Sequence, residues 1–383
     1  MRILCTPVFR YLLPILCAAA LSAAQAAAPI PAPPSVAGSG HLLIDHNSGQ
    51  ILAEANADAR LEPASLTKIM TAYVVFRELK EGNIRLEDQV VVSKKAWRTP
   101  GSRMFIEVNK KISVEDLLEG MIIQSGNDAS VALAEHIAGS EETFADLMNT
   151  HARRLGMADS NFRNATGLPD AEHYTTAHDI ARVTSATILE FPQFYAWYKV
   201  KEFTFNNIKQ HNRNQLLWRD DSVDGVKTGY TEGAGYCLVA SAERDDMRLI
   251  SVVMGTDSVG SRTAESQSLL NYGFRFFESH KLYGKEEEVS KVRIWKGEQS
   301  ELPVGPAGSI YATIPRRQYK NLSSSMEIDP QIMAPVTRGQ RLGRVLVSLG
   351  DQQIAEVPLV ALQDVADGGI WPQVKDSVLL WFE

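Results

Sequence analysis

A serine and a lysine that could act together stand three residues apart where a long apolar segment begins. Ser65 and Lys68 belong to the run Pro-Ala-Ser-Leu-Thr-Lys at residues 63–68, and residues 69–76 are almost wholly apolar. Positions i and i+3 share one face of a helix, so the hydroxyl and the amine can meet. A buried amine tends to shed its proton, and a neutral lysine is a base that makes a neighbouring serine nucleophilic. The alternative is an ordinary lysine whose stem lies on apolar surface while its ammonium reaches water.

Two further polar motifs follow along the chain. Ser125-Gly126-Asn127 separates two apolar segments, and Lys227-Thr228-Gly229 precedes an alternating, strand-like segment. Each tripeptide alone is a weak signal, because composition produces a given tripeptide in about one of ten such chains. Ser-x-x-Lys followed by Ser-x-Asn and Lys-Thr-Gly is far more specific, since closely similar motifs mark the serine enzymes that react with penicillin.

The elements expected around these motifs place them on a helix, a loop and a strand. Pro63 suits the first turn of a helix that Gly82 ends, and Ser113 caps a second helix. A hairpin, an antiparallel meander and a late helix are predicted at residues 41–54, 225–254 and 264–277. Helices packed on an antiparallel sheet give an α+β fold of two layers or more.

The chain resembles the low-molecular-mass penicillin-binding proteins of the 5/6 type, which are serine D-alanyl-D-alanine carboxypeptidases. The resemblance covers nearly the whole chain after residue 26 and rests on residues 63–68, 124–129, 212–214, 224–229 and 273–278. It implies a β-lactamase/transpeptidase-like α+β domain and a small C-terminal all-β domain. It also implies an enzyme without a cofactor that trims peptidoglycan pentapeptides ending in D-Ala-D-Ala and is acylated by β-lactams.

The resemblance assigns catalytic roles to the first two motifs. Ser65 Oγ would attack the carbonyl between the two D-alanines, and Lys68 would take its proton. The second ammonium, Lys227, would lower the pKa of Lys68 through like-charge repulsion. Ser125 would relay a proton to the leaving amine, while Asn127 would hold the substrate amide and orient Lys68.

The remaining site residues would bind the substrate. Lys227 and Thr228 would hold its terminal carboxylate, and the resemblance adds Arg213 and Arg262 to that anion site. The N–H groups of Ser65 and of Tyr230, just past Gly229 on the strand edge, would form the oxyanion hole.

The sequence departs from its relatives at three points. Tyr230 stands where some of them carry histidine, which leaves the role of its side chain open. The second motif is Ser-Gly-Asn rather than the Ser-Asp-Asn of class A β-lactamases. No Glu-x-x-Leu-Asn segment lies between residues 150 and 190, which argues against efficient β-lactamase turnover. Two alternatives remain: a DD-endopeptidase with weak β-lactamase activity, and a penicillin-binding sensor or scaffold without turnover.

Charge and motif content exclude other classes of function. The formal net charge of −7 disfavours nucleic acid as a partner. There is no His-Glu-x-x-His, Walker or dinucleotide-binding pattern, and His173 and His178 look like structural residues. The sequence therefore predicts no metal and no cofactor.

The chain is expected to divide into an export signal, two domains and a tail. We predict a signal peptide at 1–26, a Pro-rich linker at 27–38, the catalytic domain at 39–280, a β-sandwich at 285–365 and an amphipathic helix at 367–383. The tail has apolar and aromatic residues at helical spacing but is too short to span a bilayer. These features predict an exported protein held peripherally at the periplasmic face of a bacterial inner membrane.

Overall fold

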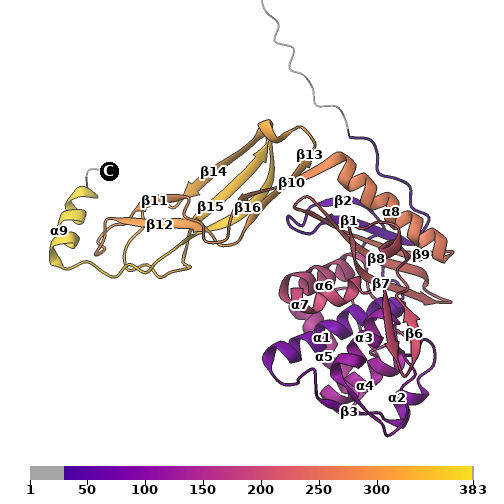
Figure 1. Cartoon of the computed structure of the whole chain (residues 1–383). Helices are drawn as coiled ribbons and strands as arrows, with labels where there is room; N and C mark the ends of the chain where they lie inside the picture. Colours follow the sequence, from indigo (N-terminus) through magenta and orange to yellow (C-terminus); the bar gives the residue numbers. More distant parts are fainter. Residues whose placement is uncertain (1–29, 382–383) are drawn as a thin grey trace, which may run out of the picture. The chain divides into compact units, whose positions relative to one another are not determined.

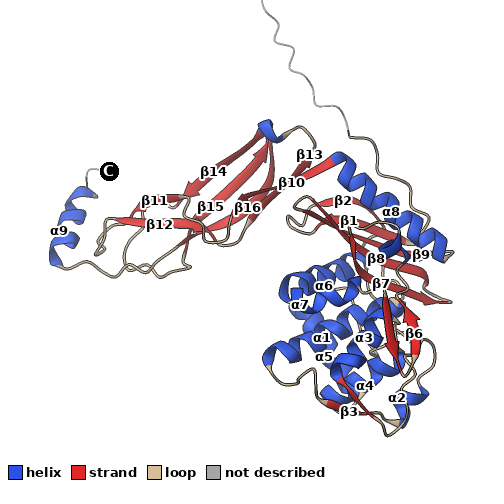
Figure 2. Cartoon of the chain, viewed as in Figure 1, coloured by secondary structure: helices blue, strands red, loops and turns tan. Residues whose placement is uncertain are grey.

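A five-stranded antiparallel sheet organises the part of the chain that carries the motifs. The computed structural model describes residues 30–381, so the predicted signal peptide lies outside the described residues. The strand order is β2-β1-β9-β8-β7, and the strands are β1 (Gly40–Asp45), β2 (Ile51–Ala55), β7 (Val223–Thr231), β8 (Gly235–Arg244) and β9 (Met247–Thr256). Strands β8 and β9 are buried over most of their length, because α8 (Val259–Phe276) covers one face and α6 (Ala177–Glu190) lies on the other (Figures 1 and 2).

The predicted hairpin and the predicted meander belong to this one sheet. The pairing of β1 with β9, for example Leu42 opposite Val252, joins them across about two hundred residues of sequence. Sequence patterns predict both pieces but not their union, since register between distant strands is set by the shared core and not by local pattern.

The helix that opens beside Ser65 is the centre of the helical layer. A short 3-10 turn, η1 (Ala64–Leu66), leads into α1 (Thr67–Glu81), and every residue of α1 from Thr67 to Phe76 is buried. A helix that is apolar on all sides can only be stable inside a core. It ends as predicted at Gly82, whose positive φ of 76° forms the C-cap.

Further helices belong to this part of the chain, and two of them flank the second motif. They are α2 (Lys94–Arg98), α3 (Val114–Ile123), α4 (Asn127–Ala138), α5 (Glu141–Arg154), α7 (Pro192–Tyr195), η2 (Ala196–Lys199) and η3 (Gln215–Trp218). Ser113 caps α3 by accepting a hydrogen bond from the backbone N–H of Asp116, as its sequence context predicts. Two small two-stranded antiparallel sheets complete this part: β3 (Gln89–Val91) with β4 (Lys111–Ser113), and β5 (Glu202–Phe205) with β6 (Ile208–His211).

The C-terminal part is all-β except for two short helical segments. A five-stranded sheet has the order β11-β12-β16-β15-β14, and β10 pairs with β13. The elements are β10 (Phe277–Tyr283), β11 (Ser290–Arg293), β12 (Glu301–Pro306), β13 (Ile310–Pro315), η4 (Tyr319–Asn321), β14 (Leu322–Ile328), β15 (Arg341–Leu349) and β16 (Gln352–Ala361). Its buried valine, leucine and isoleucine side chains form a core of their own.

The tail forms a short helix, α9 (Ile370–Leu379), with its apolar side chains in solvent. Trp371 is 84 % exposed, and Trp381 just beyond the helix is 89 % exposed. Single exposed apolar residues are common on proteins, but Ile370, Val374, Val378 and Trp381 lie together along one face of the tail. Among residues 30–381, no helix combines the length and apolar character needed to cross a bilayer.

Candidate active site

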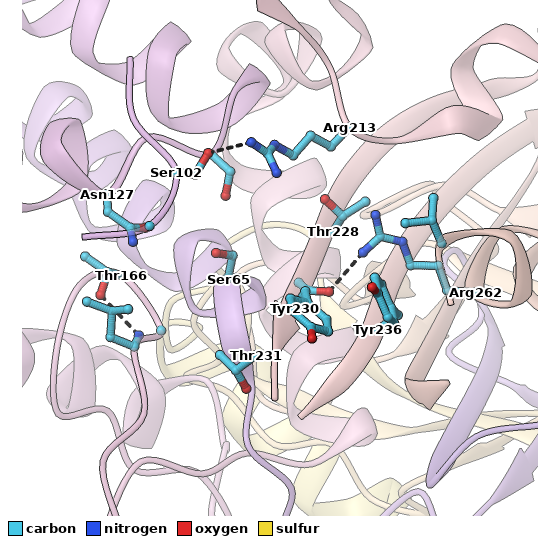
Figure 3. A pocket seen from close by; sticks show the side chains of 16 residues that line it. Ser65, Ser102, Asn127, Thr166, Arg213, Thr228, Tyr230, Thr231, Tyr236 and Arg262 are labelled. Carbon is cyan, nitrogen blue, oxygen red and sulfur yellow. Dashed lines mark hydrogen bonds between the residues drawn. The ribbon is translucent and has the colours of Figure 1, made fainter. Parts of the chain in front are cut away.

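A cavity of about 300 Å³ lies between the edge strand β7 and the helices around α1. Figure 3 shows Ser65, Asn127 and Thr166 on one side of it and Thr228, Tyr230 and Arg262 on the other. The predicted site residues that line it are Ser65, Ser125, Asn127, Arg213, Thr228, Gly229, Tyr230 and Arg262. Lys68 and Lys227 are buried, 1 % and 3 % exposed, and Lys68 reaches the hydroxyl of Ser65. The structure thus brings the three motifs together, as the sequence predicts.

Lys68 is the best-connected polar group of the site. Its Nζ lies 2.9 Å from Ser65 Oγ, 2.7 Å from Asn127 Oδ1 and 2.7 Å from the carbonyl oxygen of Thr166. An amide oxygen and a carbonyl oxygen can only accept hydrogen bonds, whereas a serine hydroxyl can also donate one. When the amine is neutral, its two N–H groups therefore satisfy Asn127 and Thr166. The lone pair then points at the only partner that can give it a proton, Ser65.

Burial keeps the amine of Lys68 close to the neutral state. Burial, and after it the nearby guanidinium of Arg213, lower the pKa of Lys68 to about 7, while Asp128 and Glu141 oppose the shift. Arg213 is thus a cation whose effect on Lys68 the sequence does not predict. Lys68 and Lys227 repel each other as well: burial first, and then the charge of Lys68, hold the pKa of Lys227 well below its ordinary value.

The backbone on either side of Ser65 is unusual. Ala64 has a φ of 47°, a conformation that residues with a side chain rarely adopt. Gly229 of β7 lies against this turn so closely that a Cβ on it would stand 3.3 Å from Ser65 N and 3.1 Å from Ala64 Cβ. The absence of a side chain at Gly229 is therefore what lets the strand edge approach the serine.

The second motif occupies the loop between α3 and α4. Ser125 has a φ of 69°, lies on the cavity and makes no hydrogen bond through its hydroxyl to another residue among 30–381. Asn127 begins α4; its Nδ2 donates to Pro100 O at 2.6 Å and its backbone N–H donates to Ser102 O at 2.7 Å. These two bonds fix the amide oxygen that accepts a hydrogen bond from Lys68. The hydroxyl of Ser125 is available to a ligand.

The cationic residues differ in how many of their N–H donors already have hydrogen-bond partners. Lys227 Nζ contacts only the carbonyl of Thr228, at 3.1 Å, among the hydrogen bonds of the described residues. Arg213 donates to Ser102 Oγ at 2.9 Å. Arg262 donates from Nη1 to two backbone carbonyls, Gly229 O at 2.9 Å and Cys237 O at 3.4 Å. Lys227 and Arg213 therefore keep most of their donors for an anion, while part of Arg262 holds the strands.

Two loops contribute residues that sequence reasoning does not single out. Gly101, Ser102, Thr166, Gly167 and Leu168 also line the cavity. The loop at 164–168 is shaped by Asn164, whose Oδ1 accepts hydrogen bonds from Thr166 N at 3.1 Å, Thr166 Oγ1 at 2.8 Å and Gly167 N at 2.7 Å. The Asn-Ala-Thr-Gly sequence there is a signal for such an asparagine turn, but not for its proximity to Lys68.

Gly167 is expected to be indispensable to the fold of this loop. Its φ is 83°, and a Cβ on it would overlap the carbonyl group of Ala64. Gly139 has nearly the same φ, 76°, but a Cβ there would meet nothing within 4 Å. We expect Gly139→Ala to cost about 1–2 kcal/mol of stability from backbone strain alone. Gly167→Ala should cost roughly 3 kcal/mol or more, because strain and overpacking add.

Thermal unfolding of the two variants measures this difference. Equal losses of melting temperature would show that the loop at 164–168 does not press against Ala64.

The histidines that could suggest a metal have structural partners instead. His173 is buried, and its Nε2 lies 3.0 Å from Thr67 Oγ1. His178 pairs with Asp58 and Glu54 on the surface. Among residues 30–381 no three His, Cys, Asp or Glu side chains gather in a way that could hold a metal ion.

Three features of the cavity define the class of the protein. They are a buried lysine that faces a serine hydroxyl, a second serine on a loop, and a strand edge that carries cations. These are the parts of an active-site serine enzyme that reacts with penicillin and transfers an acyl group, built on helices and an antiparallel sheet.

Comparison with known proteins identifies the family within that class. Residues 26–258 match the family model described as D-alanyl-D-alanine carboxypeptidase, and residues 277–367 match that of the penicillin-binding protein 5 C-terminal domain. The chain is 47 % identical over 359 residues to D-alanyl-D-alanine carboxypeptidase DacC of Escherichia coli (strain K12), covering 91 % of this chain and 89 % of that one. The chain therefore belongs to the D-alanyl-D-alanine carboxypeptidases, which are serine hydrolases.

Solved structures agree with this assignment. Penicillin-binding protein 5 from Haemophilus influenzae superposes with a TM-score of 0.84 at 41 % identity, covering 88 % of this chain and 99 % of that chain. Penicillin-binding protein D2 from Listeria monocytogenes in its ampicillin-bound form matches with a TM-score of 0.59 at 28 % identity, covering 64 % of this chain and 100 % of that chain. The predicted fold class and family are confirmed.

Proposed function

We propose that Ser65 is the nucleophile, Lys68 its base and Ser125 the proton relay in removing the terminal D-alanine of peptidoglycan pentapeptides. The observation that supports these roles is the hydrogen-bond set of Lys68, in which only Ser65 can donate to the neutral amine. Ser65 Oγ attacks the carbonyl carbon while its proton passes to Lys68 Nζ. The C–N bond then breaks, and the departing D-alanine takes a proton through Ser125.

The ester on Ser65 is then hydrolysed, which regenerates the serine and releases the shortened peptide. The negative charge that develops on the carbonyl oxygen in both steps would be held by the N–H groups of Ser65 and Tyr230. The close approach of β7 to Ser65 at Gly229 supports this placement.

The cations of the cavity would select a substrate with a free C-terminal carboxylate. Lys227 is buried with one carbonyl partner, and burial and neighbouring cations lower its pKa. A carboxylate bound beside it, together with Arg213 and the Thr228 hydroxyl, would supply the missing counter-charge. Arg262 would add positive potential to this site.

The function is tested with penicillin and with a peptide. Penicillin, whose carboxylate and strained amide mimic the dipeptide, should add covalently to the protein, and peptide mapping should place the adduct on Ser65. A pentapeptide ending in D-Ala-D-Ala should release D-alanine. Absence of the adduct, or an adduct elsewhere, would contradict the proposed nucleophile.

Amidation of the peptide C-terminus isolates the role of the cations. We expect the amide to react with a kcat/KM about 10- to 100-fold lower than the free acid, since it loses hydrogen bonds between charged groups. Equal kcat/KM values for the two peptides would show that the cations do not read the carboxylate.

We also propose that α9 associates the exported enzyme with a membrane surface, and that the division into a signal peptide, linker, catalytic domain, β domain and tail holds as predicted. The exposed apolar side chains of α9 and of Trp381 support this proposal. Lys375 is the only Lys or Arg between residues 367 and 383, so binding should depend on apolar burial more than on lipid charge.

Liposome flotation tests the tail. The full-length protein should float with neutral and anionic vesicles alike, whereas a chain ending at residue 366 and the double variant Trp371→Ser/Trp381→Ser should stay at the bottom. Tyr319→Ser, which removes an aromatic that is 55 % exposed but lies outside the tail, serves as the matched control and should float. Equal flotation of all four proteins would contradict a role for α9.

A further inference from the structure

Two tyrosines form a stack at the mouth of the cavity. Tyr230 on β7 and Tyr236 on β8 are directly opposite each other in the strand register. Their ring centroids are 4.3 Å apart with an interplanar angle of 33°. Both line the cavity, and Figure 3 shows the two rings side by side with Arg262 next to Tyr236. The sequence leaves the role of the Tyr230 side chain open, and this contact supplies one.

Arg262 of α8 extends the stack and ties it to the backbone. Its guanidinium carbon is 5.6 Å from the centroid of the Tyr236 ring, within the range of a cation–π contact. Its Nη1 donates to Gly229 O and Cys237 O, and these two residues are the register pair next to Tyr230 and Tyr236. One buried side chain from α8 thus braces two consecutive residue pairs of the hairpin.

The hairpin end is also fixed from the side of Ser65. Thr231 Oγ1 donates to Glu62 Oε2 at 3.1 Å and accepts a hydrogen bond from Ala234 N at 2.9 Å. Glu62 lies three residues before Ser65 in the chain. The strand end that carries the Tyr230 N–H is therefore held between the stack and the turn that leads to Ser65.

This end of β7 needs such support. β7 is the last strand in the order of its sheet, so one side of its backbone has no neighbouring strand. An oxyanion donor contributes most when it is held in place before the charge develops, and the loss of one donor typically lowers kcat by about 10²- to 10³-fold. A frayed strand end would lose part of that contribution even though its N–H remains.

We propose that Tyr230, Tyr236 and Arg262 act as one brace that positions the Tyr230 N–H for the transition state. The proposal rests on the proposed function, in which this N–H is an oxyanion donor. Tyr236 and Arg262 are positioning residues, because they act on the reaction through the backbone of β7. The side chain of Tyr230, 54 % exposed, contributes its ring face to the brace.

The experiment compares kcat and KM of Tyr230→Ala, Tyr236→Ala and the double variant with those of the wild type on a pentapeptide ending in D-Ala-D-Ala. We expect each alanine variant to lose about 10- to 100-fold in kcat with KM within threefold, since the backbone N–H is misplaced rather than removed. The kcat of the double variant should be no lower than that of the less active single variant, because the two rings form one unit. Tyr230→Phe, which keeps the ring, should restore most of the lost kcat.

Tyr319→Ala is the matched control. Tyr319 is equally exposed, at 55 %, and its ring also lies against another ring, that of His280, at 4.6 Å. This control should retain wild-type kcat and KM. If an alanine variant does not fold, Tyr230→Leu and Tyr236→Leu keep the bulk without the aromatic face and replace it.

The possible outcomes distinguish a failure of the brace from a failure of the proposed function. A rise in KM with unchanged kcat would mean that the rings only touch the substrate and would overturn the brace. Additive losses in the double variant would overturn it as well. A wild-type protein that forms no penicillin adduct on Ser65 would instead refute the proposed function on which the brace depends.

Discussion

Replacing Lys68 with methionine is expected to lower the rate at which penicillin acylates Ser65 by about 10³-fold. Methionine has a similar length and suits a buried position, so the substitution removes the base with little change in packing. Ser65 would keep its place in η1 but would have no partner to take its proton, since the other two partners of Lys68 are the Asn127 amide and the Thr166 carbonyl. Intact-mass spectrometry over a time course of penicillin labelling measures the rate.

A lysine outside the site provides the control for this variant. Lys209 is exposed and pairs with Glu202, so Lys209→Met should label at the wild-type rate. Thermal unfolding should show that Lys68→Met is folded. Asn127 Oδ1 and Thr166 O lose a hydrogen-bond partner, but they lie next to a cavity from which water can replace it. Labelling of Lys68→Met within tenfold of the wild type would mean that another group removes the proton.

Lys227→Met is expected to lower kcat/KM for the free-acid pentapeptide by about 10²- to 10³-fold. Removing one partner of a buried charge pair typically costs several kcal/mol, because the other charge is left without compensation. The peptide whose C-terminus is amidated carries no such charge, so the same substitution should affect it by less than about tenfold. The variant should therefore lose most of the discrimination between acid and amide.

The lowered pKa of Lys227 also predicts that carboxylate binding depends on pH. In the free enzyme that pKa is lowered, first by burial and then by Lys68, Arg213 and Arg262. A bound carboxylate favours the protonated amine, so ligand binding takes up a proton and weakens as the pH rises. Titration of a carboxylate ligand into the wild type, in buffers of different ionisation enthalpy, should show proton uptake that Lys227→Met loses. Equal losses of kcat/KM for the free-acid and the amidated peptide, or no proton uptake in the titration, would contradict the assignment of Lys227 to the substrate carboxylate.

The elements that carry the three motifs follow from local sequence. Residues 69–76 are almost wholly apolar on every side of a helix, which predicts burial, and the i, i+3 spacing predicts the contact between Ser65 and Lys68. The cap at Ser113 and the stop at Gly82 follow from capping chemistry. These features are predictable because each depends on residues within about one turn of helix.

The rest of the site depends on contacts between distant segments, which local pattern does not encode. Thr166 reaches Lys68 across 98 positions of sequence, and Arg262 reaches Gly229 across 33. The positive φ of Ala64 is held by the packing of Gly167 and Gly229 against it and by no property of alanine. The contribution of Arg213 to the low pKa of Lys68 is not predicted for the same reason, since the proximity of these two residues arises only in the tertiary structure.

The pH dependence of Ser65 acylation tests the central claim most directly, namely that a lysine kept neutral by burial activates the serine. The second-order rate constant for penicillin labelling reports the ionisation of the free enzyme. Since only neutral Lys68 can accept the proton, the rate should rise about tenfold per pH unit at acidic pH and stop rising above an apparent pKa near 7. A rate that does not change between pH 5 and 7, or that keeps rising towards the ordinary lysine value of 10.5, would contradict the account.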